Sequence, residues 1–385
     1  MRRHTAAPRP DHERIVQEQG LVYNTIERPD GSTRLFWNES AYYSFSINEI
    51  MELERVTQEL HDKCLETVDY VITKRRYRDF QIPEAAWPSI ERTWEEDSPS
   101  LYGRFDLRYD GKGPAKLLEY NADTPTALLE AAVIQWYWLE ETQGGRDQWN
   151  SLHERLVACW KRHTPRLPNR RVYFAYTEEE TTGEDLMTVT YLRETANQAG
   201  LSTETLSMEQ IGWDMAANRF VDAAQAPITT IFKLYPWEWL LADRFGSHVL
   251  ETMNLTQWIE PTWKCILANK ALLALLWERY PNHPNLLPAF LPSSGYLTSY
   301  VRKPILGREG ANVEIVTPGN NFRTAGPYGA EGFVYQEYAP LPDFDGLYPV
   351  LGTWIIDGEA AGMGIRESDT LITDNQSRFV PHVID

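Results

Sequence analysis

The sequence has few cysteines and lacks the cysteine patterns of metal sites and disulfide frameworks. Its 385 residues include Cys64, Cys159 and Cys265, which lie far apart. There is no CxxC pair and no Cys/His spacing typical of zinc. The chain is therefore predicted to work in the reducing cytoplasm.

Long hydrophobic runs and an excess of basic residues are also missing. No window approaches 18 apolar residues, which argues against a membrane-spanning helix. The 37 Lys and Arg residues are outnumbered by 55 Asp and Glu residues, so the net charge is −18. Nucleic acids and anionic membranes are bound through basic surfaces, and neither is an expected partner. The acidic excess is compatible with a cationic partner, although solubility explains it equally well.

The chain does contain enough apolar material for a sizeable core, with 42% hydrophobic residues, 14 Trp and 20 Tyr. Residues 1–22 carry basic charge with no apolar stretch behind it, and we interpret them as a disordered start. A helix is predicted over 48–77, because Ser46 and Glu49 have the spacing of a capping box and apolar residues follow at helical intervals.

The remaining pattern changes character along the chain. Helices are predicted over 127–141, 149–163, 185–199 and 269–280, and strands over 171–176 and 228–234. From Tyr296 onward, β-branched and apolar runs alternate with Gly and Pro turns. These runs predict antiparallel strands over 297–301, 313–316, 332–338 and 350–356. Helix–strand alternation followed by such a portion predicts an α+β or mixed α/β enzyme.

Polar residues that a core has no reason to hold gather first in two short segments, 103–106 and 116–126. In a strand over 117–121, Glu119 and Asn121 point to one face, and Arg104 and Asp106 share a face in the same way. If the two strands pair, Asp106, Glu119 and Asn121 form an all-oxygen cluster of the kind that Mg²⁺ prefers. An exposed polar hairpin with one salt bridge explains the same pattern.

Two later segments combine cations with glycine. Lys303 ends a strand and leads into a loop with Gly307 and Gly310, which offers a cation and free backbone amides to a polyphosphate. An ordinary basic hairpin turn is the alternative. In 359–367, small residues permit close backbone approach and Arg366 could reach a transferring phosphoryl group; a Gly-rich turn beside a structural Arg explains that segment equally well.

Taken together, these blocks resemble the synthetase domain of the glutathionylspermidine synthase family and its single-domain relatives. The resemblance runs from about Tyr23 to Asp385. Its blocks are Arg104–Asp106, Leu118–Thr126, Phe232–Trp239, Asn269–Lys270, Lys303–Gly310, Gln336–Tyr338 and Gly362–Arg366. It implies an ATP-grasp fold, ATP and Mg²⁺ with two metal ions, and a reaction that joins a carboxylate to an amine through an acyl-phosphate.

The resemblance also implies roles for individual residues. Asp106, Glu119 and Asn121 would be metal ligands, and Arg104 would stabilise the γ-phosphoryl group during transfer. Lys270 and Lys303 would bind ATP phosphates beneath the loop of Gly307 and Gly310, Gln336 and Glu337 would lie at the adenine, and Arg308 and Arg366 would close over the acyl-phosphate. Thr124 and Thr126 would lie near the carboxylate substrate, and Glu184 and Asp185 near the amine.

The same resemblance implies an organisation and a set of partners. Residues 23–165 are expected to form a helical portion with the metal-binding strand pair, 166–268 an α/β portion of pre-ATP-grasp type, and 269–385 the ATP-grasp nucleotide-binding portion. All three belong to one synthetase unit. The bifunctional members carry an amidase domain ahead of this region, and its hydrolytic activity is not expected here. Small-molecule carboxylates and amines, glutathione-like and polyamine-like, are the expected substrates.

Two other functions compete with a ligase. A non-catalytic relative could bind a polyamine or a nucleotide and act as a sensor or partner protein, but such a protein would be expected to lose some of the site residues. A hydrolase built on the carboxylate pair of Asp106 and Glu119 leaves the lysines and loop arginines unexplained. ADP release in the presence of amine and carboxylate distinguishes the ligase from both.

Overall fold

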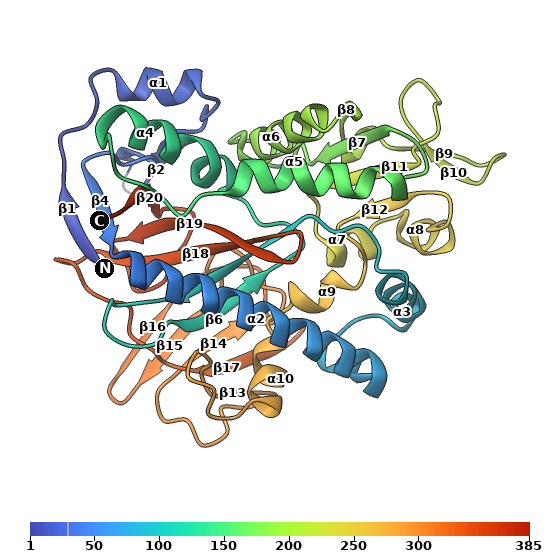
Figure 1. The fold of residues 1–385 in the computed structure, drawn as a ribbon. Helices are drawn as coiled ribbons and strands as arrows, with labels where there is room; N and C mark the ends of the chain where they lie inside the picture. Colours follow the sequence, from blue (N-terminus) through green and yellow to red (C-terminus); the bar gives the residue numbers. More distant parts are fainter. Residues whose placement is uncertain (29–30) are drawn as a thin grey trace.

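A computed structural model describes residues 1–28 and 31–385, and it has a mixed helix and strand architecture (Figure 1). The α-helices are α1 (His12–Glu18), α2 (Ile47–Lys74), α3 (Trp87–Glu95), α4 (Gln135–Thr142), α5 (Leu152–His163), α6 (Glu184–Gln198), α7 (Trp237–Ala242), α8 (Gly246–Glu251), α9 (Lys264–Leu267) and α10 (Leu272–Arg279). Shorter helical turns cover Arg76–Phe80, Glu84–Ala86, Glu130–Ile134, Thr164–Arg166 and Met208–Gln210.

One sheet is parallel, with the order β12-β11-β7-β8. Its strands are β7 (Arg171–Tyr176), β8 (Ser202–Ser207), β11 (Thr230–Lys233) and β12 (Gln257–Ile259), and α6 connects β7 to β8. The connection from β7 runs to one edge of the sheet and that from β11 to the other. Ligands of open α/β sheets bind where the strand order reverses in this way, at the carboxyl ends of the strands. Thr177 and Leu234, which follow β7 and β11, both line the cavity described below.

Two antiparallel five-stranded sheets make up most of the remaining framework. The first has the order β20-β19-β18-β5-β6, and the second β13-β17-β14-β15-β16. The first contains β5 (Tyr102–Arg108), β6 (Lys116–Asn121), β18 (Tyr348–Ile356), β19 (Glu359–Ser368) and β20 (Arg378–Val380). The second contains β13 (Ala289–Phe290), β14 (Tyr300–Pro304), β15 (Glu314–Thr317), β16 (Asn320–Arg323) and β17 (Phe333–Glu337). The prediction of a strand-rich terminal portion is confirmed.

The smaller sheets hold peripheral segments together. β1 (Arg2–Thr5), β4 (Ala41–Phe45) and β21 (His382–Ile384) form one sheet, β2 (Thr25–Glu27) pairs with β3 (Thr33–Leu35), and β9 (Gly212–Asp214) pairs with β10 (Arg219–Val221). The two ends of the chain therefore meet on β4. None of the helices in the described ranges has the length and apolar character needed to cross a bilayer.

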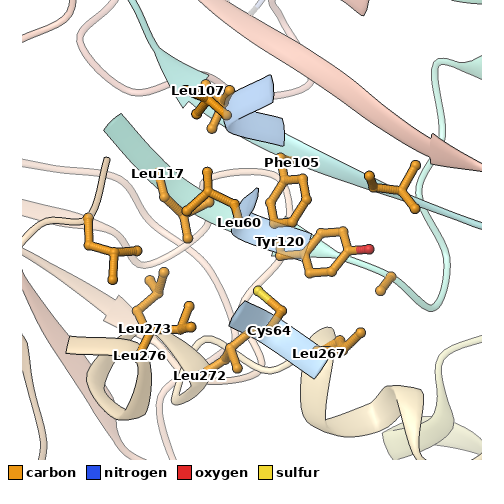
Figure 2. Packing of buried hydrophobic residues seen from close by; sticks show 14 of the residues in the cluster. Leu60, Cys64, Phe105, Leu107, Leu117, Tyr120, Leu267, Leu272, Leu273 and Leu276 are labelled. Atoms are coloured by element: carbon orange, nitrogen blue, oxygen red, sulfur yellow. The ribbon is translucent and has the colours of Figure 1, made fainter. Parts of the chain in front are cut away.

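The long helix α2 carries one side of the larger core (Figure 2). Its start is fixed by the predicted capping box, in which the Ser46 hydroxyl accepts from the Glu49 backbone N–H and the Glu49 carboxylate accepts from the backbone N–H of Ser46. Leu60 and Cys64 of this helix pack toward β5, β6 and α10. The hydrophobic face of α2 thereby supports the back of the strand pair that carries the polar cluster.

In the β5–β6 pair, successive side chains face alternately toward the core and toward the site. Phe105 lies opposite Tyr120, and their rings stack with centroids 3.8 Å apart on the core side. The neighbouring positions face the other way, with Arg104 opposite Asn121 and Asp106 opposite Glu119. Because side chains alternate across a strand, packing of the two aromatic rings places the polar residues on the opposite face. The predicted pairing of these strands is confirmed.

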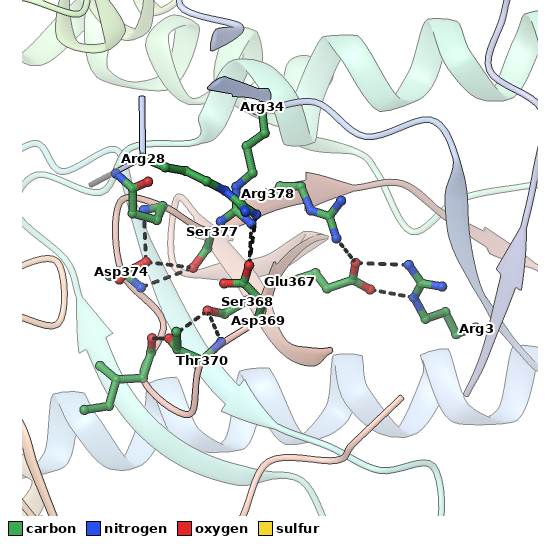
Figure 3. Close-up of polar contacts among 12 residues, drawn as sticks. Arg3, Arg28, Arg34, Glu367, Ser368, Asp369, Thr370, Asp374, Ser377 and Arg378 are labelled. Atoms are coloured by element: carbon green, nitrogen blue, oxygen red, sulfur yellow. Dashed lines mark hydrogen bonds and ion pairs between the residues drawn. The ribbon is translucent and has the colours of Figure 1, made fainter. Parts of the chain in front are cut away.

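The expectation of a disordered start is wrong. Arg2–Thr5 pair with β4, and the side chain of Arg3 reaches Glu367 at the end of β19, with Nε 2.7 Å from Oε2 (Figure 3). The Glu367 side chain is fully buried and also accepts from Arg378 and from the Tyr43 hydroxyl. Glu367 lies 364 residues from Arg3 and 324 residues from Tyr43 in sequence, so no local pattern reveals these contacts.

The structure refines two further interpretations. The helix predicted over 127–141 begins with a π-helical turn, Glu130–Ile134, before α4. The glycine-rich segment that contains Arg366 is a ten-residue strand, β19, and not a turn. Its glycines permit close packing: a Cβ at Gly364 would lie 2.4 Å from the Phe379 ring. The suggestion that small residues allow close approach there is confirmed.

Candidate active site

A cavity of about 480 Å³ opens where both five-stranded sheets meet the carboxyl ends of β7 and β11. Of the predicted site residues, all except Glu184 line it. They are Arg104, Asp106, Glu119, Asn121, Thr124, Thr126, Asp185, Lys270, Lys303, Gly307, Arg308, Gly310, Gln336, Glu337 and Arg366. Segments separated by up to 262 residues in sequence, from Arg104 to Arg366, are thus brought to one place.

The two carboxylates of the oxygen cluster on β5 and β6 form ion pairs with arginine and lysine side chains. Asp106 Oδ1 accepts from Arg104 Nε at 2.9 Å, and Asp106 Oδ2 forms an ion pair with Arg366. Glu119 Oε2 lies 3.1 Å from Lys270 Nζ. Although burial alone would raise the pKa of Glu119, the charges of Lys270 and Lys303 lower it to about 2. The carboxylate therefore stays ionised at neutral pH.

The donor chemistry of this cluster fits Mg²⁺. Two carboxylates and an amide oxygen from neighbouring strand positions face the cavity, and hard divalent cations prefer oxygen ligands. Asn121 Oδ1 also accepts from the Thr124 backbone N–H at 3.2 Å, which orients the amide. A bound cation would share these oxygens with Arg104, Arg366 and Lys270, because each carboxylate oxygen offers more than one lone pair.

Lysines approach the cluster from the second antiparallel sheet and from the start of α10. Lys270 Nζ donates to the Gly307 carbonyl at 2.6 Å, which ties the loop to the cavity wall. Lys303 Nζ donates to the Leu118 carbonyl and to Gln336 Oε1, at 2.9 and 2.8 Å. Burial disfavours the charged form of Lys303 and lowers its pKa to about 8. We call Lys270, Lys303, Gln336 and Glu337 the lysine side of the cavity.

Arg104 links the oxygen cluster to the segment that carries Thr126. Its Nη1 donates to the Thr126 carbonyl at 2.7 Å, and the guanidinium lies 5.8 Å from the centre of the Trp354 ring. Burial works against its charge, but the carboxylates of Asp106, Glu119 and Glu184 outweigh that effect and raise the pKa of Arg104. The positive charge of Arg104 is therefore stabilised both by the oxygen cluster and by the carboxylate of Glu184.

Acidic residues form a second group in the lining, and the charges that act on Asp185 come mainly from other carboxylates. Glu179, Glu180, Asp185 and Glu309 line the cavity, and Glu184 lies directly beside Asp185. We call these five residues the acidic side. Burial raises the pKa of Asp185 to about 8, with further contributions from the carboxylates of Glu184 and Glu180. Burial likewise raises the pKa of Glu184, although a hydrogen bond with Thr126 opposes the shift.

A buried carboxyl group lies behind the acidic side. Glu130, on the π-helical turn, is fully buried, and the Tyr23 hydroxyl donates to its Oε1 at 3.0 Å. Burial raises the pKa of Glu130 to about 8, and the Glu184 carboxylate adds to the shift. Raised carboxyl pKa values thus accompany this side of the cavity, in contrast to the lowered value at Glu119.

A second group of possible metal ligands lies outside the cavity. Cys159, His163 and Asp357 have ligand atoms within 4.8 Å of one another. His163 Nε2 is already 3.0 Å from the Ser100 carbonyl, and Asp357 forms an ion pair with Arg162. With these partners in place, we assign no metal to this group.

Several lining residues were not found from the sequence. Glu179 and Glu180 stand in a short acidic run whose usual explanation is solvation. Glu309 and Trp239 lie inside blocks of the family resemblance but were given no role, and Leu371–Thr373 belong to no motif. The run of three glutamates, 178–180, directly after the predicted strand 171–176 was the one available signal, because it follows the carboxyl end of a parallel strand.

Comparison with known proteins identifies relatives of this chain. The family model described as "Glutathionylspermidine synthase preATP-grasp" matches residues 3–385. A Haemophilus influenzae protein with the name "Putative acid--amine ligase" is 42% identical, with 99% of each chain covered. A trypanothione synthetase of Crithidia fasciculata is 30% identical over 83% of this chain and 53% of its own length. The chain therefore spans about half of that relative.

The fold has a counterpart among solved structures. A glutathione-synthetase-like effector from Globodera pallida superimposes with a TM-score of 0.59 at 9% identity, covering 97% of this chain and 96% of the other. The sequence relatives are ligases and synthetases, in agreement with the predicted carbon–nitrogen ligase. The chain belongs to the glutathionylspermidine synthase family.

Proposed function

We propose that the protein is an ATP- and Mg²⁺-dependent ligase that joins a carboxylate to an amine as an amide, through an acyl-phosphate, and releases ADP and phosphate. The observation that carries this proposal is the division of one cavity by charge. Lysines adjoin the oxygen cluster, the other carboxylates adjoin one another, and Arg104, Arg308 and Arg366 line the same cavity.

The lysine side suits a nucleotide. Lys270 and Lys303 offer charge to phosphates, and Asp106, Glu119 and Asn121 would hold Mg²⁺, which neutralises phosphate charge when bound. Gln336 and Glu337 would meet the adenine. We further propose an ATP-grasp fold with portions at 23–165, 166–268 and 269–385, supported by the two antiparallel sheets that enclose this side.

In phosphoryl transfer, the protein contributes mainly by positioning the reacting groups and stabilising charge, and little by covalent chemistry. Arg104 would stabilise charge on the transferred phosphoryl group, while Arg308 and Arg366 would hold the acyl-phosphate. Thr124 and Thr126 would hold the carboxylate substrate. A closed loop over 307–310 would exclude water, which otherwise hydrolyses the intermediate.

The acidic side suits a cationic amine. An ammonium group bound there would pair with Asp185 and Glu184, and it must lose a proton before its lone pair attacks the acyl carbon. A carboxyl group whose pKa lies near 8 is a suitable acceptor once it has ionised, at about pH 8 and above. A polyamine-like substrate with several charges would match several carboxylates, and a peptide such as glutathione would be the carboxylate.

An ADP-coupled screen tests the proposal. Amino acids and peptides are crossed with amines and polyamines, and mass spectrometry identifies any product. We expect ADP release that requires one carboxylate and one amine together, with a product whose mass equals both substrates minus water. Binding of nucleotide or amine without turnover by any pair would refute the ligase and favour the sensor.

A further inference from the structure

The aromatic segment Tyr235–Trp239 leads into α7 and has no role in the reaction proposed above. Two contacts fix it to the turn after β6. Lys233 Nζ lies 2.7 Å from Asp123 Oδ1, with both side chains fully buried, and Asp123 Oδ2 accepts from the Trp237 backbone N–H at 2.8 Å. The start of α7 is therefore held rigidly against the residues that carry Thr124.

Arg308 reaches across from the glycine loop to this fixed segment. Its Nη1 donates to Thr124 Oγ1 at 2.8 Å, and its Nη2 donates to Glu238 Oε1 at 2.6 Å. The guanidinium also lies 5.8 Å from the centre of the Trp239 ring. Burial works against the charge of Arg308, but the Glu238 carboxylate outweighs it and the pKa of Arg308 is raised. One guanidinium thus joins the loop to two separate segments.

The loop itself is seated closely on the cavity wall. The Gly307 carbonyl accepts from Lys270, and Gly310 has a φ of +68° with its backbone against the Thr373 carbonyl. A Cβ at Gly310 would lie 2.7 Å from that oxygen. Residues with side chains are strained at such a φ and would clash at this distance. The closed position of the loop is therefore defined by contacts on both sides of Arg308.

Glu238 holds Arg308 from behind. Arg308 and Thr124 line the cavity, whereas Glu238 is not among its lining residues. The Nε of Arg308 is buried and has no hydrogen-bond partner in the part of the chain that the structure describes. A guanidinium has five N–H donors, so the contacts to Thr124 and Glu238 leave donors free for a ligand in the cavity.

We propose that Glu238 is a positioning residue that holds Arg308, and with it the loop 307–310, over the phosphoryl group that is transferred. The proposal rests on the proposed ligase function. Prealigned charge contributes to phosphoryl transfer, and displacement of a group by about 1 Å can cost about 100-fold in rate. The competing role is that of a resting partner that must release Arg308 before turnover.

Kinetics of Glu238→Gln distinguish these roles. We expect kcat to fall about 10- to 100-fold while the KM for ATP changes less than about twofold, because the lysines still bind the phosphates. Asp243→Asn is the matched control, since it removes an exposed carboxylate at the other end of α7 that contacts only the Arg244 backbone N–H among the described residues. Glu238→Gln combined with Arg308→Gln should be no slower than Arg308→Gln alone. An increase in kcat, or fully additive losses, would overturn the positioning role.

Limited trypsin digestion provides a readout that does not depend on activity. Cleavage after Arg308 requires the loop to open, so its rate reports how firmly Glu238 holds the side chain. We expect faster cleavage at this bond in Glu238→Gln than in the wild type or Asp243→Asn, detected by intact-mass analysis of fragments. Equal rates in all three proteins would refute the inference. Absence of turnover in the wild type would instead refute the ligase, and the digestion would still decide whether Glu238 positions the loop.

Discussion

The lysine side and the acidic side of the cavity shift the pKa of a carboxyl group in opposite directions. Glu119, beside Lys270 and Lys303, has a pKa lowered to about 2, whereas Asp185 has a pKa raised to about 8. Partial burial acts to raise the pKa of both side chains, so burial alone does not separate them. The neighbouring charges do: Glu119 faces lysines, and Asp185 faces other carboxylates.

This difference indicates what each side can bind. A carboxylate that stays ionised can hold a metal ion at any physiological pH. The carboxyl groups of Asp185 and Glu184 resist ionisation, although Arg308 favours the charged form of the first and Arg104 that of the second. Under the proposed function, a cationic amine would add the positive charge that these two groups need, while a nucleotide would bind on the lysine side, where Glu119 is paired with Lys270.

The largest effect is expected from Arg104, whose charge is stabilised by carboxylates of both groups. Arg104→Gln should lower kcat about 1,000-fold, because the charge on the transferred phosphoryl group loses its central cation. Steady-state ADP release measures the effect. Arg108→Gln is the control on the same strand, where the side chain points to the Pro340 carbonyl and Asp110 and does not line the cavity. Equal activity of the two variants would contradict a catalytic role for Arg104.

A change on the acidic side should affect the amine and spare the nucleotide. At pH 9, where Asp185 is mostly ionised, Asp185→Asn is expected to raise the KM for the amine about tenfold, equivalent to about 1.4 kcal/mol, and to leave the KM for ATP unchanged. Glu194→Gln, an exposed position later on the same helix, is the control. An increase in the ATP KM of the Asp185 variant would mean that the two sides are not separate.

The pH dependence should sharpen the same comparison. Asp185 is mostly protonated below pH 8 and must ionise to pair with an ammonium group, while alkyl ammonium groups keep their charge to about pH 10. The KM for the amine in the wild type should therefore fall about tenfold between pH 7 and pH 9. Asp185→Asn should show a flat profile over this interval, and a wild-type KM that rises with pH would contradict the assignment.

The smallest effect concerns stability. The pKa of Glu130 is raised to about 8 in the folded chain, so the native state binds more protons than the unfolded chain between about pH 4 and pH 8, and stability is lost as pH rises through that interval. Glu130→Gln should leave the Tm unchanged at pH 5 and raise it by a few degrees at pH 9. Glu140→Gln, an exposed position on α4, should change neither value. A lower Tm for Glu130→Gln at pH 9 would show that the ionised carboxylate is stabilising.

Local signals predicted the elements whose ends and faces are set by nearby residues. The capping box of Ser46 and Glu49 located α2, and strict alternation located the β5–β6 pair. The start of the chain was misread and β19 was not predicted, because their order depends on tertiary partners such as Glu367 for Arg3 and Phe379 for Gly364. A π-helical turn at Glu130 has no sequence pattern that separates it from an α-helix.

In the site, too, the sequence does not reveal residues whose role depends on distant partners. Family resemblance named residues that touch the cavity directly, and the fold brings almost all of them together. Glu238 and Glu130 act from behind the lining, and their partners Arg308 and Tyr23 are distant in sequence. Such residues can be recognised only when the contacts of the lining residues are known.

The central claim is that the cavity transfers a phosphoryl group to a carboxylate before the amine attacks. The most direct measurement follows oxygen from the carboxylate. With the substrate pair found in the screen, a carboxylate labelled with ¹⁸O is incubated with ATP, Mg²⁺ and amine, and the released phosphate is analysed by mass spectrometry. The account predicts one ¹⁸O atom in each phosphate formed, because the carboxylate oxygen remains on phosphorus when the acyl–oxygen bond breaks. Phosphate without the label, formed while the amide accumulates, would contradict it.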